Sequence, residues 1–421
     1  MGSINGNFCL QRGKEDLRIL FAADVSIKKV LGGAERFLLG QTTRLSEKGH
    51  EIHIITRRLP IHGSSYGNIK NVHEWRYSVN EKNTFIFLAS TVLNCRKLYR
   101  LVSQKTSFDI INFHQPFSAL GINLRLKSGQ IKKVYTCLSL SFEEFETRNP
   151  KPSKILPRIS YKINSYFRKW IEKFSISRCS LIFVLSEFTK NKLIKHYKIN
   201  PRKIHIIPGG VDINRFKFNE NKMAIRQQLG LSKEKFILFT VRNLVPRMGL
   251  ETLIQAMKEI IKSVNDIYLI IGGEGELREK LKNLILELNL RDFVKLQGFI
   301  SDEDLPFYYQ SADFFILPTK WLEGFGLVTV EAMSCGTPVL GTPVGGTIEI
   351  LNKFDSNFLF KDTSLESIAE LILDKYNYYK DKPEKYKQLS KKCREFVEEN
   401  YSWERNIDKT EALFARLIKE Q

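Results

Sequence analysis

The chain has 421 residues, of which 43% are hydrophobic, and a formal net charge of +20 at pH 7. This length is greater than one hydrophobic core usually serves, and it predicts two domains. The hydrophobic fraction is typical of a soluble globular protein, which argues against a disordered or fibrous chain. No apolar run reaches the roughly 18 residues that a transmembrane helix needs.

The first residues, MGSINGNFCLQRGKEDL, lack the apolar core of a signal peptide. The six cysteines lie far apart, without the paired spacing of a disulfide framework or a zinc site. Both observations predict a protein of the reducing cytoplasm.

The positive charge is concentrated in the first half of the chain. Residues 1–210 hold 36 Lys and Arg against 14 Asp and Glu, whereas residues 211–421 hold 30 against 32. A basic half predicts an anionic partner, which could be nucleic acid, an acidic membrane surface or an acidic substrate. Since the chain contains no recognisable nucleic-acid-binding module, nucleic acid is not the expected partner and stays an alternative.

Residues 1–14 are predicted to form a disordered leader. Beyond them, short apolar runs alternate with stretches of helical periodicity, which predicts doubly wound α/β domains with parallel sheets. The predicted strands are 17–25, 50–58, 109–114, 132–139, 181–186 and 203–209 in the first half, then 235–243, 266–273, 293–299, 312–319 and 338–342. The predicted domains are 15–210 and 211–395, followed by a segment, 396–421, whose last helix is capped by Ser402.

Ligands of doubly wound domains bind outside the carboxyl ends of the strands, so residues that follow strands are the candidates. Gly32 and Gly33 follow the first strand and precede a helix, where bare N–H groups could meet a phosphate or the chain could simply turn. His114 ends the strand 109–114 and is either functional or a satisfied strand-end histidine.

Two further turns follow strands of the second half. Arg242 and Arg247 flank a turn before a helix and could clamp a diphosphate, although surface arginines are common. The turn Gly273–Gly275 resembles half of a dinucleotide fingerprint without its third glycine, and it suits a nucleotide that approaches the backbone. Asp302 and Asp304 could hold a metal, but Ser301 as a helix cap with acids in the first turn is the better interpretation.

The stretch EGFGLVTVE places Glu323 in a loop and Glu331 about one turn into a helix predicted over 327–334. Free N–H groups of Phe325, Gly326 and Leu327 could hold a phosphate at the start of that helix. Paired carboxylates in this setting suit two sets of vicinal hydroxyls.

This stretch resembles the E-x7-E motif of the retaining GT-B glycosyltransferases of family four. Agreement extends over residues 17–410, with segments such as FDIINFH, IIPGGVDINRF, GGEGELREKL and EAMSCGTPVLGTPVGG in the expected order. The resemblance implies two Rossmann-like domains that face a cleft, with a C-terminal helix that crosses back to the first domain. It also implies transfer of a hexose-type sugar, with retention and without a metal cofactor, from a nucleotide sugar to a hydroxyl of a glycan, glycolipid or lipid-linked acceptor.

The resemblance also implies roles for individual residues. Glu331 would bind the ribose, Glu323 the donor sugar, and His114 would lie near the donor sugar and the acceptor. The remaining donor-binding positions are Gly33, Asn243, Gly273, Glu274, Gly275, Ile300, Phe325, Gly326 and Leu327.

The chain departs from the family at the two positions that usually carry Arg and Lys against the leaving diphosphate. Asn243 and Met248 stand there, and Arg242 and Arg247 each lie one residue earlier. We expect these arginines, Arg247 first, to supply the charge. A phosphorylase, an epimerase or a catalytically silent relative of the same fold remain alternatives.

The segment KPSKILPRISYKINSYFRKWIEKFSISR, residues 151–178, mixes basic residues with Tyr, Phe, Trp and Ile at helical spacing. It could lie on an anionic membrane at the cytoplasmic face, or it could be an ordinary amphipathic helix packed on the domain.

Overall fold

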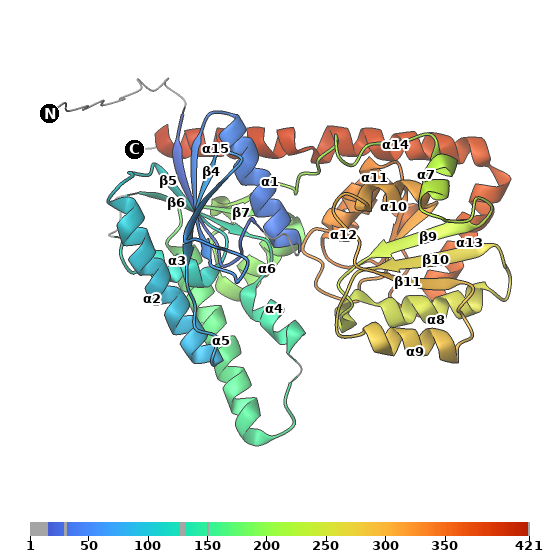
Figure 1. Ribbon diagram of the computed structural model, residues 1–421, viewed down its shortest axis with the longest axis horizontal. Coiled ribbons are helices and arrows are strands. Elements are labelled where there is room, and N and C mark those ends of the chain that lie inside the picture. The colour runs from blue at the N-terminus through green and yellow to red at the C-terminus, as the bar shows by residue number, and fades with distance from the viewer. Residues whose placement is uncertain (1–15, 29–31, 127–130, 150, 420–421) are drawn as a thin grey trace. The chain divides into compact units, whose positions relative to one another are not determined.

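The computed structural model describes residues 16–28, 32–126, 131–149 and 151–419. The predicted leader, 1–14, lies outside the described residues. The chain divides into two compact units, one of residues 1–137, 151–183 and 411–421 and one of residues 138–150 and 184–410 (Figure 1). The boundary at residue 210 and the other domain limits expected from the sequence remain predictions.

The first sheet has eight strands in the order β3-β4-β2-β1-β5-β6-β7-β8. The register of its centre is parallel, with Ile19 opposite both Ile52 and Ile110. Every strand predicted for this half is present, and most are shorter than predicted. The strands are β1 (Arg18–Ala22), β2 (Glu51–Arg57), β3 (Tyr66–Ile69), β4 (Val72–Tyr77), β5 (Ile110–Phe113), β6 (Lys132–Cys137), β7 (Leu181–Val184) and β8 (Ile204–Ile206).

The hairpin of β3 and β4 was not predicted. Its turn uses Lys70 and Asn71 with φ of 50° and 62°, and β4 lies parallel to β2 while β3 is antiparallel to β4. The buried Glu74 on β4 accepts hydrogen bonds from Arg76 Nε at 2.9 Å and from Thr56 and Ser26. Because these buried polar residues satisfy one another, β4 lacks the apolar run by which hydropathy identifies a buried strand.

The helices of the first unit cover both faces of the sheet, as expected for a doubly wound domain (Figure 1), whereas the helices at 141–148 and 187–197 group with the second unit. The core is built from fully buried side chains such as Phe21 on β1 and Leu38 on α1. The helices are α1 (Gly33–Glu47), α2 (Thr84–Ser103), α3 (Pro116–Asn123), α4 (Ser141–Arg148), α5 (Ile155–Ser177), α6 (Glu187–Tyr197) and η1 (Pro201–Lys203).

The second sheet has five parallel strands in the order β11-β10-β9-β12-β13, and all five were predicted. Its strands are β9 (Phe236–Val241), β10 (Ile267–Gly272), β11 (Val294–Gly298), β12 (Phe314–Leu317) and β13 (Val339–Gly341). The elements around it are α7 (Lys222–Gln228), η2 (Pro246–Met248), α8 (Leu250–Ile260), α9 (Arg278–Glu287), α10 (Leu305–Ser311), α11 (Leu327–Ser334), α12 (Gly346–Phe354), η3 (Ser356–Phe358), α13 (Leu365–Asp381) and α14 (Pro383–Tyr401). The α11 bounds agree with the sequence prediction.

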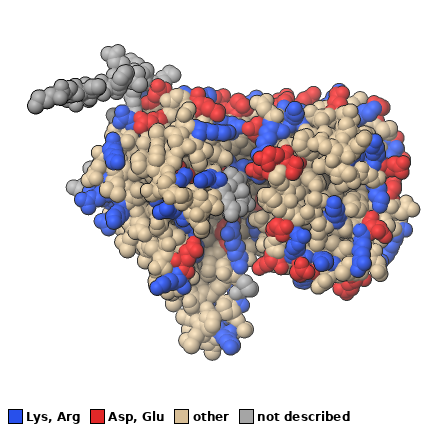
Figure 2. Space-filling model, in the orientation of Figure 1, with Lys and Arg blue, Asp and Glu red and all other residues tan. Residues whose placement is uncertain are grey.

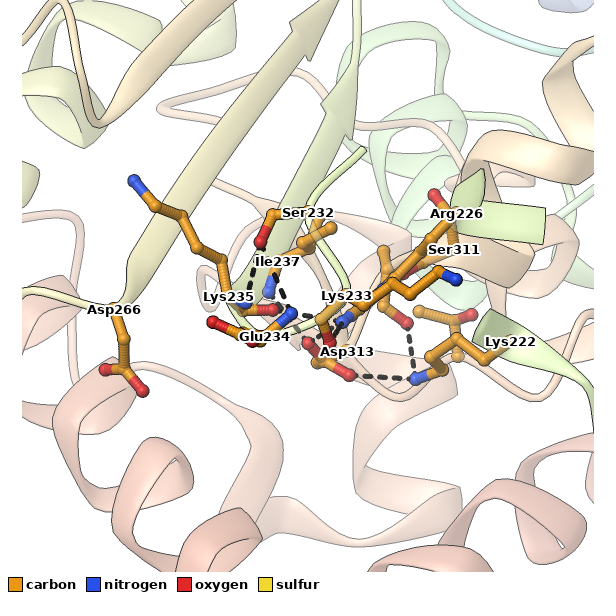
Figure 3. A network of polar contacts seen from close by, with 12 residues as sticks. Lys222, Arg226, Ser232, Lys233, Glu234, Lys235, Ile237, Asp266, Ser311 and Asp313 are labelled. Atoms are coloured by element: carbon orange, nitrogen blue, oxygen red, sulfur yellow. Dashed lines mark hydrogen bonds and ion pairs between the residues drawn. The ribbon is translucent and has the colours of Figure 1, made fainter. Parts of the chain in front are cut away.

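A buried ionic network ties together the amino ends of β9 and β12 (Figure 3). The carboxylate of Asp313 is fully buried and accepts from Arg226 Nη2 at 2.6 Å, from the Ile237 N–H at 2.7 Å and from Lys222 Nζ at 3.0 Å. Since each charge is paired and hydrogen-bonded, this cluster orders the sheet edge opposite to the one that carries the candidate site.

The last helix, α15 (Trp403–Lys419), begins after Ser402, whose hydroxyl accepts from the Arg405 N–H at 3.4 Å. This confirms the predicted cap. Its final turns group with the first unit, where Glu411 Oε1 lies 2.9 Å from His50 Nε2 and Phe414 stacks on Phe183 with ring centroids 5.7 Å apart. The C-terminal helix therefore returns to the first unit.

Among the described residues, no helix has both the length and the apolar character needed to cross a bilayer. The five cysteines in the described part of the chain are free and buried.

Candidate functional site

The candidate donor site lies in the second unit, in the loops that follow β9, β10 and β12. Because these strands are neighbours and parallel, their carboxyl ends meet at one edge of the sheet. The loop after β9 carries Arg242 and Arg247, and the loop after β12 carries Glu323. The α11 helix, which carries Glu331, follows that second loop directly.

Arg242 and Glu323 form a buried ion pair. Nη2 of Arg242 donates to Oε2 of Glu323 at 2.5 Å, and the Thr319 hydroxyl donates to the same oxygen at 3.3 Å. Both charged residues are only 9% exposed, so their attraction is weakly screened. The other oxygen of Glu323, Oε1, accepts no hydrogen bond from the described residues. The carboxylate is therefore oriented by one oxygen and has the other to offer.

Met248 is the second partner of Arg242. The Nε and Nη2 groups of Arg242 donate to the Met248 thioether sulfur at 3.2 Å and 2.9 Å, and a thioether is a weak acceptor. The methionine thus occupies the position where the family pattern has a lysine, and it packs against a neighbouring cation. Nη1 of Arg242 donates to none of the described residues, so one edge of the guanidinium stays available.

Arg247 holds the loop after β12. Its Nη1 donates to the Leu322 carbonyl at 2.8 Å, and its own carbonyl accepts from the Lys320 N–H at 2.8 Å. Partial burial lowers the pKa of the Arg247 guanidinium from its ordinary value, although arginine stays charged at neutral pH. Within the described part of the chain, its Nε and Nη2 donate to nothing, so this residue also keeps free donors.

The start of α11 is an uncapped helix N-terminus. Gly326 precedes the helix with φ +91°, and no side chain accepts from the first N–H groups. A Cβ placed on Gly326 would lie 3.1 Å from the Thr329 hydroxyl and 3.4 Å from the Thr347 hydroxyl. Both hydroxyls are buried and lack a hydrogen-bond partner among the described residues. The first N–H groups of α11 and the hydroxyls of Thr329 and Thr347 therefore lie together beside Glu323, and the described residues supply no side-chain partner to them.

Glu331 lies in the second turn of α11 and is 3% exposed. The hydroxyl of the fully buried Tyr309 donates to its Oε2 at 3.0 Å. The carboxylate is thereby held in one orientation. The spacing of Glu323 and Glu331 around the start of one helix is as predicted, while their roles toward a ligand stay predictions.

Close packing explains why the turn Gly273–Gly275 has glycine at its first and third positions. Gly273 has φ +115°, and a Cβ there would lie 1.9 Å from the Arg242 carbonyl oxygen; at Gly275 it would lie 2.5 Å from the Leu244 carbonyl oxygen. The Glu274 carboxylate accepts from Arg278 at 2.9 Å and from the Phe299 N–H at 3.1 Å. The turn therefore packs closely on the arginine loop.

Two other predicted positions in this region are less enclosed. The side chain of Asn243 is exposed, and Ile300 is half-buried, with its Cδ1 2.5 Å from where a Cβ on Gly272 would stand. Phe325 is buried, and Leu327 opens α11. Nucleotide contacts at these residues remain predictions.

The acids Asp302 and Asp304 have structural partners. Asp302 lies 3.2 Å from Arg215, and Asp304 accepts from the Ser301 hydroxyl at 2.8 Å. The Ser301 hydroxyl accepts from the Asp304 N–H, as a cap does, but α10 itself begins only at Leu305. The helix starts later than predicted because a separate turn precedes it.

In the first unit, His114 follows β5 and its N–H donates to the Ala22 carbonyl at 2.9 Å. Its ring lies 5.6 Å from the Phe21 ring and 6.1 Å from the Phe37 ring. Both ring nitrogens are buried without a partner in the described part of the chain, and burial lowers the pKa of His114 to about 3. It is thus neutral and short of partners. Gly33 is the first residue of α1, whose cap Gly32 offers no side chain.

Sequence reasoning missed Thr329, Thr347, Tyr309 and the pairing of Arg242 with Glu323. The one local signal for the threonines was their place near the start of a helix behind a glycine. Their lack of partners depends on how α11 and α12 pack.

The chain is similar to known glycosyltransferases over most of its length. Two family models match: Glycosyltransferase Family 4 over residues 31–215 and Glycosyl transferases group 1 over residues 221–396. An uncharacterized glycosyltransferase of Methanocaldococcus jannaschii is 25% identical over 395 residues, which cover 90% of this chain and 93% of that protein. The UDP-Gal:alpha-D-GlcNAc-diphosphoundecaprenol alpha-1,3-galactosyltransferase of Escherichia coli is 28% identical over 329 residues, 76% of this chain and 78% of that protein.

Among solved structures, the sucrose-phosphate synthase of Thermosynechococcus elongatus has the same fold. Its TM-score is 0.79 at 21% sequence identity, with 96% of this chain and all of that chain covered.

Proposed function

Because this chain belongs to the GT-B glycosyltransferases of group 1, family four, we propose that it transfers a hexose-type sugar from a nucleotide sugar to an acceptor hydroxyl with retention of configuration. The observation that carries the proposal is the pair of buried hydroxyls of Thr329 and Thr347 at the uncapped start of α11, which have no partner among the described residues. Buried polar groups almost always have partners, so their absence here indicates a ligand that supplies them.

The donor fits this position through its charge and its hydroxyls. The diphosphate would accept from the first N–H groups of α11 and from the two threonine hydroxyls. Glu323 would accept from a sugar hydroxyl through its Oε1, and Glu331 would accept from the ribose. The E. coli relative has UDP-galactose in its name, which supports a uridine nucleotide as the first to be tested.

The leaving diphosphate gains negative charge as the donor bond breaks. Nη1 of Arg242 and the remaining donors of Arg247 belong to the same loop and would stabilise that charge in a partly dry site. This assigns to two arginines the role that the family pattern gives to an Arg and a Lys. We propose that these groups act without a metal ion, so a chelator should leave the rate unchanged.

In the proposed reaction, the bond between the anomeric carbon and the phosphate oxygen breaks, and a bond from that carbon to the acceptor oxygen forms on the same face. The acceptor proton passes to an oxygen of the departing diphosphate. We assign no protein nucleophile, because Glu323 is already paired with Arg242.

We propose that the first unit binds the acceptor. Its neutral His114, whose two ring nitrogens have no partner in the part of the chain that the structure describes, would exchange hydrogen bonds with sugar or acceptor hydroxyls. The acceptor named for the E. coli relative is diphosphoundecaprenol-linked, which supports a lipid-linked acceptor, among the glycan, glycolipid and lipid-linked acceptors that we propose. We propose in addition that the reaction belongs to cell-surface polysaccharide or glycolipid synthesis in the cytoplasm.

The experiment is a panel of UDP, GDP and ADP sugars, read by thermal shift of the full chain and by release of the nucleoside diphosphate. At least one donor should raise the melting temperature and be slowly hydrolysed. If no nucleotide sugar shifts the protein, the proposal is wrong.

A second candidate is a silent relative that binds a donor without transferring the sugar, because Asn243 and Met248 stand where the family pattern has an Arg and a Lys. Binding without hydrolysis or transfer would favour it.

A further inference from the structure

Helix α5 of the first unit presents a second apolar face that no described residue covers. Its buried residues are Tyr161, Ser165, Ile171, Glu172, Ser175 and Ile176. Ile171 packs in a cluster with Phe117 and Leu120 of α3, and the Tyr135 hydroxyl donates to Glu172 at 3.3 Å. The interpretation of α5 as a helix packed on its domain therefore describes only one of its faces.

The other face carries large apolar side chains in solvent. Leu156 is 80% exposed, Ile155 77% and Tyr166 72%. The full set is Ile155, Leu156, Ile159, Ile163, Tyr166, Phe167 and Trp170. At about 100° per residue, all seven fall within an arc of roughly 120°, nearly opposite the buried face. We call these seven residues the α5 stripe.

The first turns of α5 extend past the first sheet, and residues 153–160 are exposed on every side (Figure 1). In Figure 2 the same projection is mostly uncharged on the face in view. Phe167 stacks on Trp170 with ring centroids 6.1 Å apart, and Trp170 stacks on Phe174 at 5.5 Å. Phe174 packs on the core of the unit, whereas Tyr166, Phe167 and Trp170 are exposed. Three exposed aromatic rings on one helix face are rare on a surface that faces only water and typical of the interface between water and lipid.

The charges beside the stripe are basic. Lys154, Arg158, Lys162 and Lys173 are exposed. Lys154 precedes the first turn of the helix, and on the helical wheel the other three lie along one flank of the stripe. The only acid in residues 151–178 is Glu172, which is buried. An apolar strip with aromatic rings and a purely cationic border matches an anionic lipid surface, because the rings enter the acyl boundary while the cations meet the headgroups.

We propose that the α5 stripe and its cationic flank dock the protein onto an anionic bilayer. This proposal does not depend on the donor chemistry above, since it rests on α5 alone. Its consequence for the proposed function is that a lipid-borne acceptor would be met at the membrane and not in solution.

The test is co-sedimentation of the full chain with phosphatidylcholine vesicles that contain phosphatidylglycerol, against vesicles of phosphatidylcholine alone. The intact protein should bind the anionic vesicles at low salt and be released by high salt. Two variants divide the surface: Ile155→Ser with Leu156→Ser and Ile159→Ser, and Lys154→Gln with Arg158→Gln, Lys162→Gln and Lys173→Gln. Each should weaken binding by more than about ten-fold.

The matched control removes four exposed cations elsewhere, with Lys282→Gln, Arg291→Gln, Lys295→Gln and Lys392→Gln, and should bind as the intact protein does. An equal loss in the control would mean that net charge alone drives binding and would overturn the proposal. Absence of vesicle binding by the intact protein would also overturn the proposal. The same holds if size-exclusion chromatography shows that the intact protein is a dimer and the serine variant a monomer, because the α5 stripe would then be a protein–protein interface. Because every changed residue is exposed, an unchanged melting temperature verifies folding, and a variant that fails this check leaves the other to decide.

If the intact protein binds a donor normally but does not bind the anionic vesicles, only the role of α5 is contradicted. Normal vesicle binding without any donor binding would contradict only the proposed transferase function.

Discussion

Arg242, in the loop after β9, and Glu323, in the loop after β12, form an ion pair with a distance of 2.5 Å between Nη2 and Oε2. Both residues are about nine-tenths buried. The pair aligns one carboxylate oxygen and leaves Oε1 for a ligand, so it joins the stability of the second unit to its proposed donor site. Removing either charge leaves the other buried without a counter-charge, which is energetically unfavourable because the surroundings screen charges weakly.

Arg242→Gln should therefore lower the free energy of unfolding by about 3–5 kcal/mol. The double variant with Glu323→Gln should lose less than the sum of the single variants, with a coupling free energy above about 1 kcal/mol. Urea unfolding of the four proteins measures this coupling. The exposed pair of Arg278 and Glu274, at 2.9 Å, is the control, and its coupling should stay below about 1 kcal/mol. Equal coupling in both cycles would show that burial does not strengthen the Arg242–Glu323 pair.

Thr329→Val and Thr347→Val should have opposite effects on the stability of the unliganded protein and on its affinity for the donor. Each change removes a buried hydroxyl to which the residues that the structure describes supply no partner, so the unliganded protein should be as stable as before or more stable. Donor affinity should fall by about ten-fold for each, since a hydrogen bond to the ligand is lost. Melting temperatures and calorimetric titration provide the two readings.

Thr342→Val is the control for these threonines, because the Thr342 hydroxyl donates to the Thr319 carbonyl at 2.6 Å. It should destabilise the protein. If Thr329→Val destabilised the unliganded protein just as much, its hydroxyl would have a partner in the free protein, contrary to our account.

Gly273→Ala should destabilise the second unit by more than about 2 kcal/mol, because its φ is +115° and the new methyl group would overlap the Arg242 carbonyl. Gly230→Ala also places alanine at positive φ, +64°, but in open space, and should cost about 1 kcal/mol. Urea midpoints distinguish the two. Equal losses would mean that the turn can move away from the arginine loop.

His114 should make the stability of the first unit depend on pH. Its pKa is about 3 when folded and near 6.5 ordinarily, so the native state resists protonation. The corresponding stability is complete above pH 6.5 and is lost as the pH falls toward 3. Relative to His114→Asn, the intact protein should lose about 2 kcal/mol of unfolding free energy between pH 7 and pH 5. Parallel curves for the two proteins would show that the ring is not buried as described.

Much of the fold could be predicted from the sequence because buried parallel strands are continuous apolar runs, as in Phe236–Val241. The hairpin of β3 and β4 could not, since Glu74 and Arg76 look like surface residues until they pair inside the first unit. Local hydropathy carries no information about such a pair.

The candidate site shows the same division. The spacing of Glu323 and Glu331 and the bounds of α11 follow from a short local pattern with glycines. Arg242, the partner of Glu323, lies far from it in the sequence. The Met248 thioether contacts Arg242 only because the loop after β9 folds back on itself. These relations depend on tertiary structure, which a single sequence does not display.

The central claim is that a nucleotide sugar binds at the start of α11 with its ribose on Glu331. Calorimetric titration of the intact protein and of Glu331→Ala with UDP and UDP sugars tests it most directly, with Glu279→Ala, an exposed acid on α9, as the control. We predict affinity at least about ten-fold weaker for Glu331→Ala and unchanged for the control. Equal affinity of the intact protein and Glu331→Ala would contradict the claim.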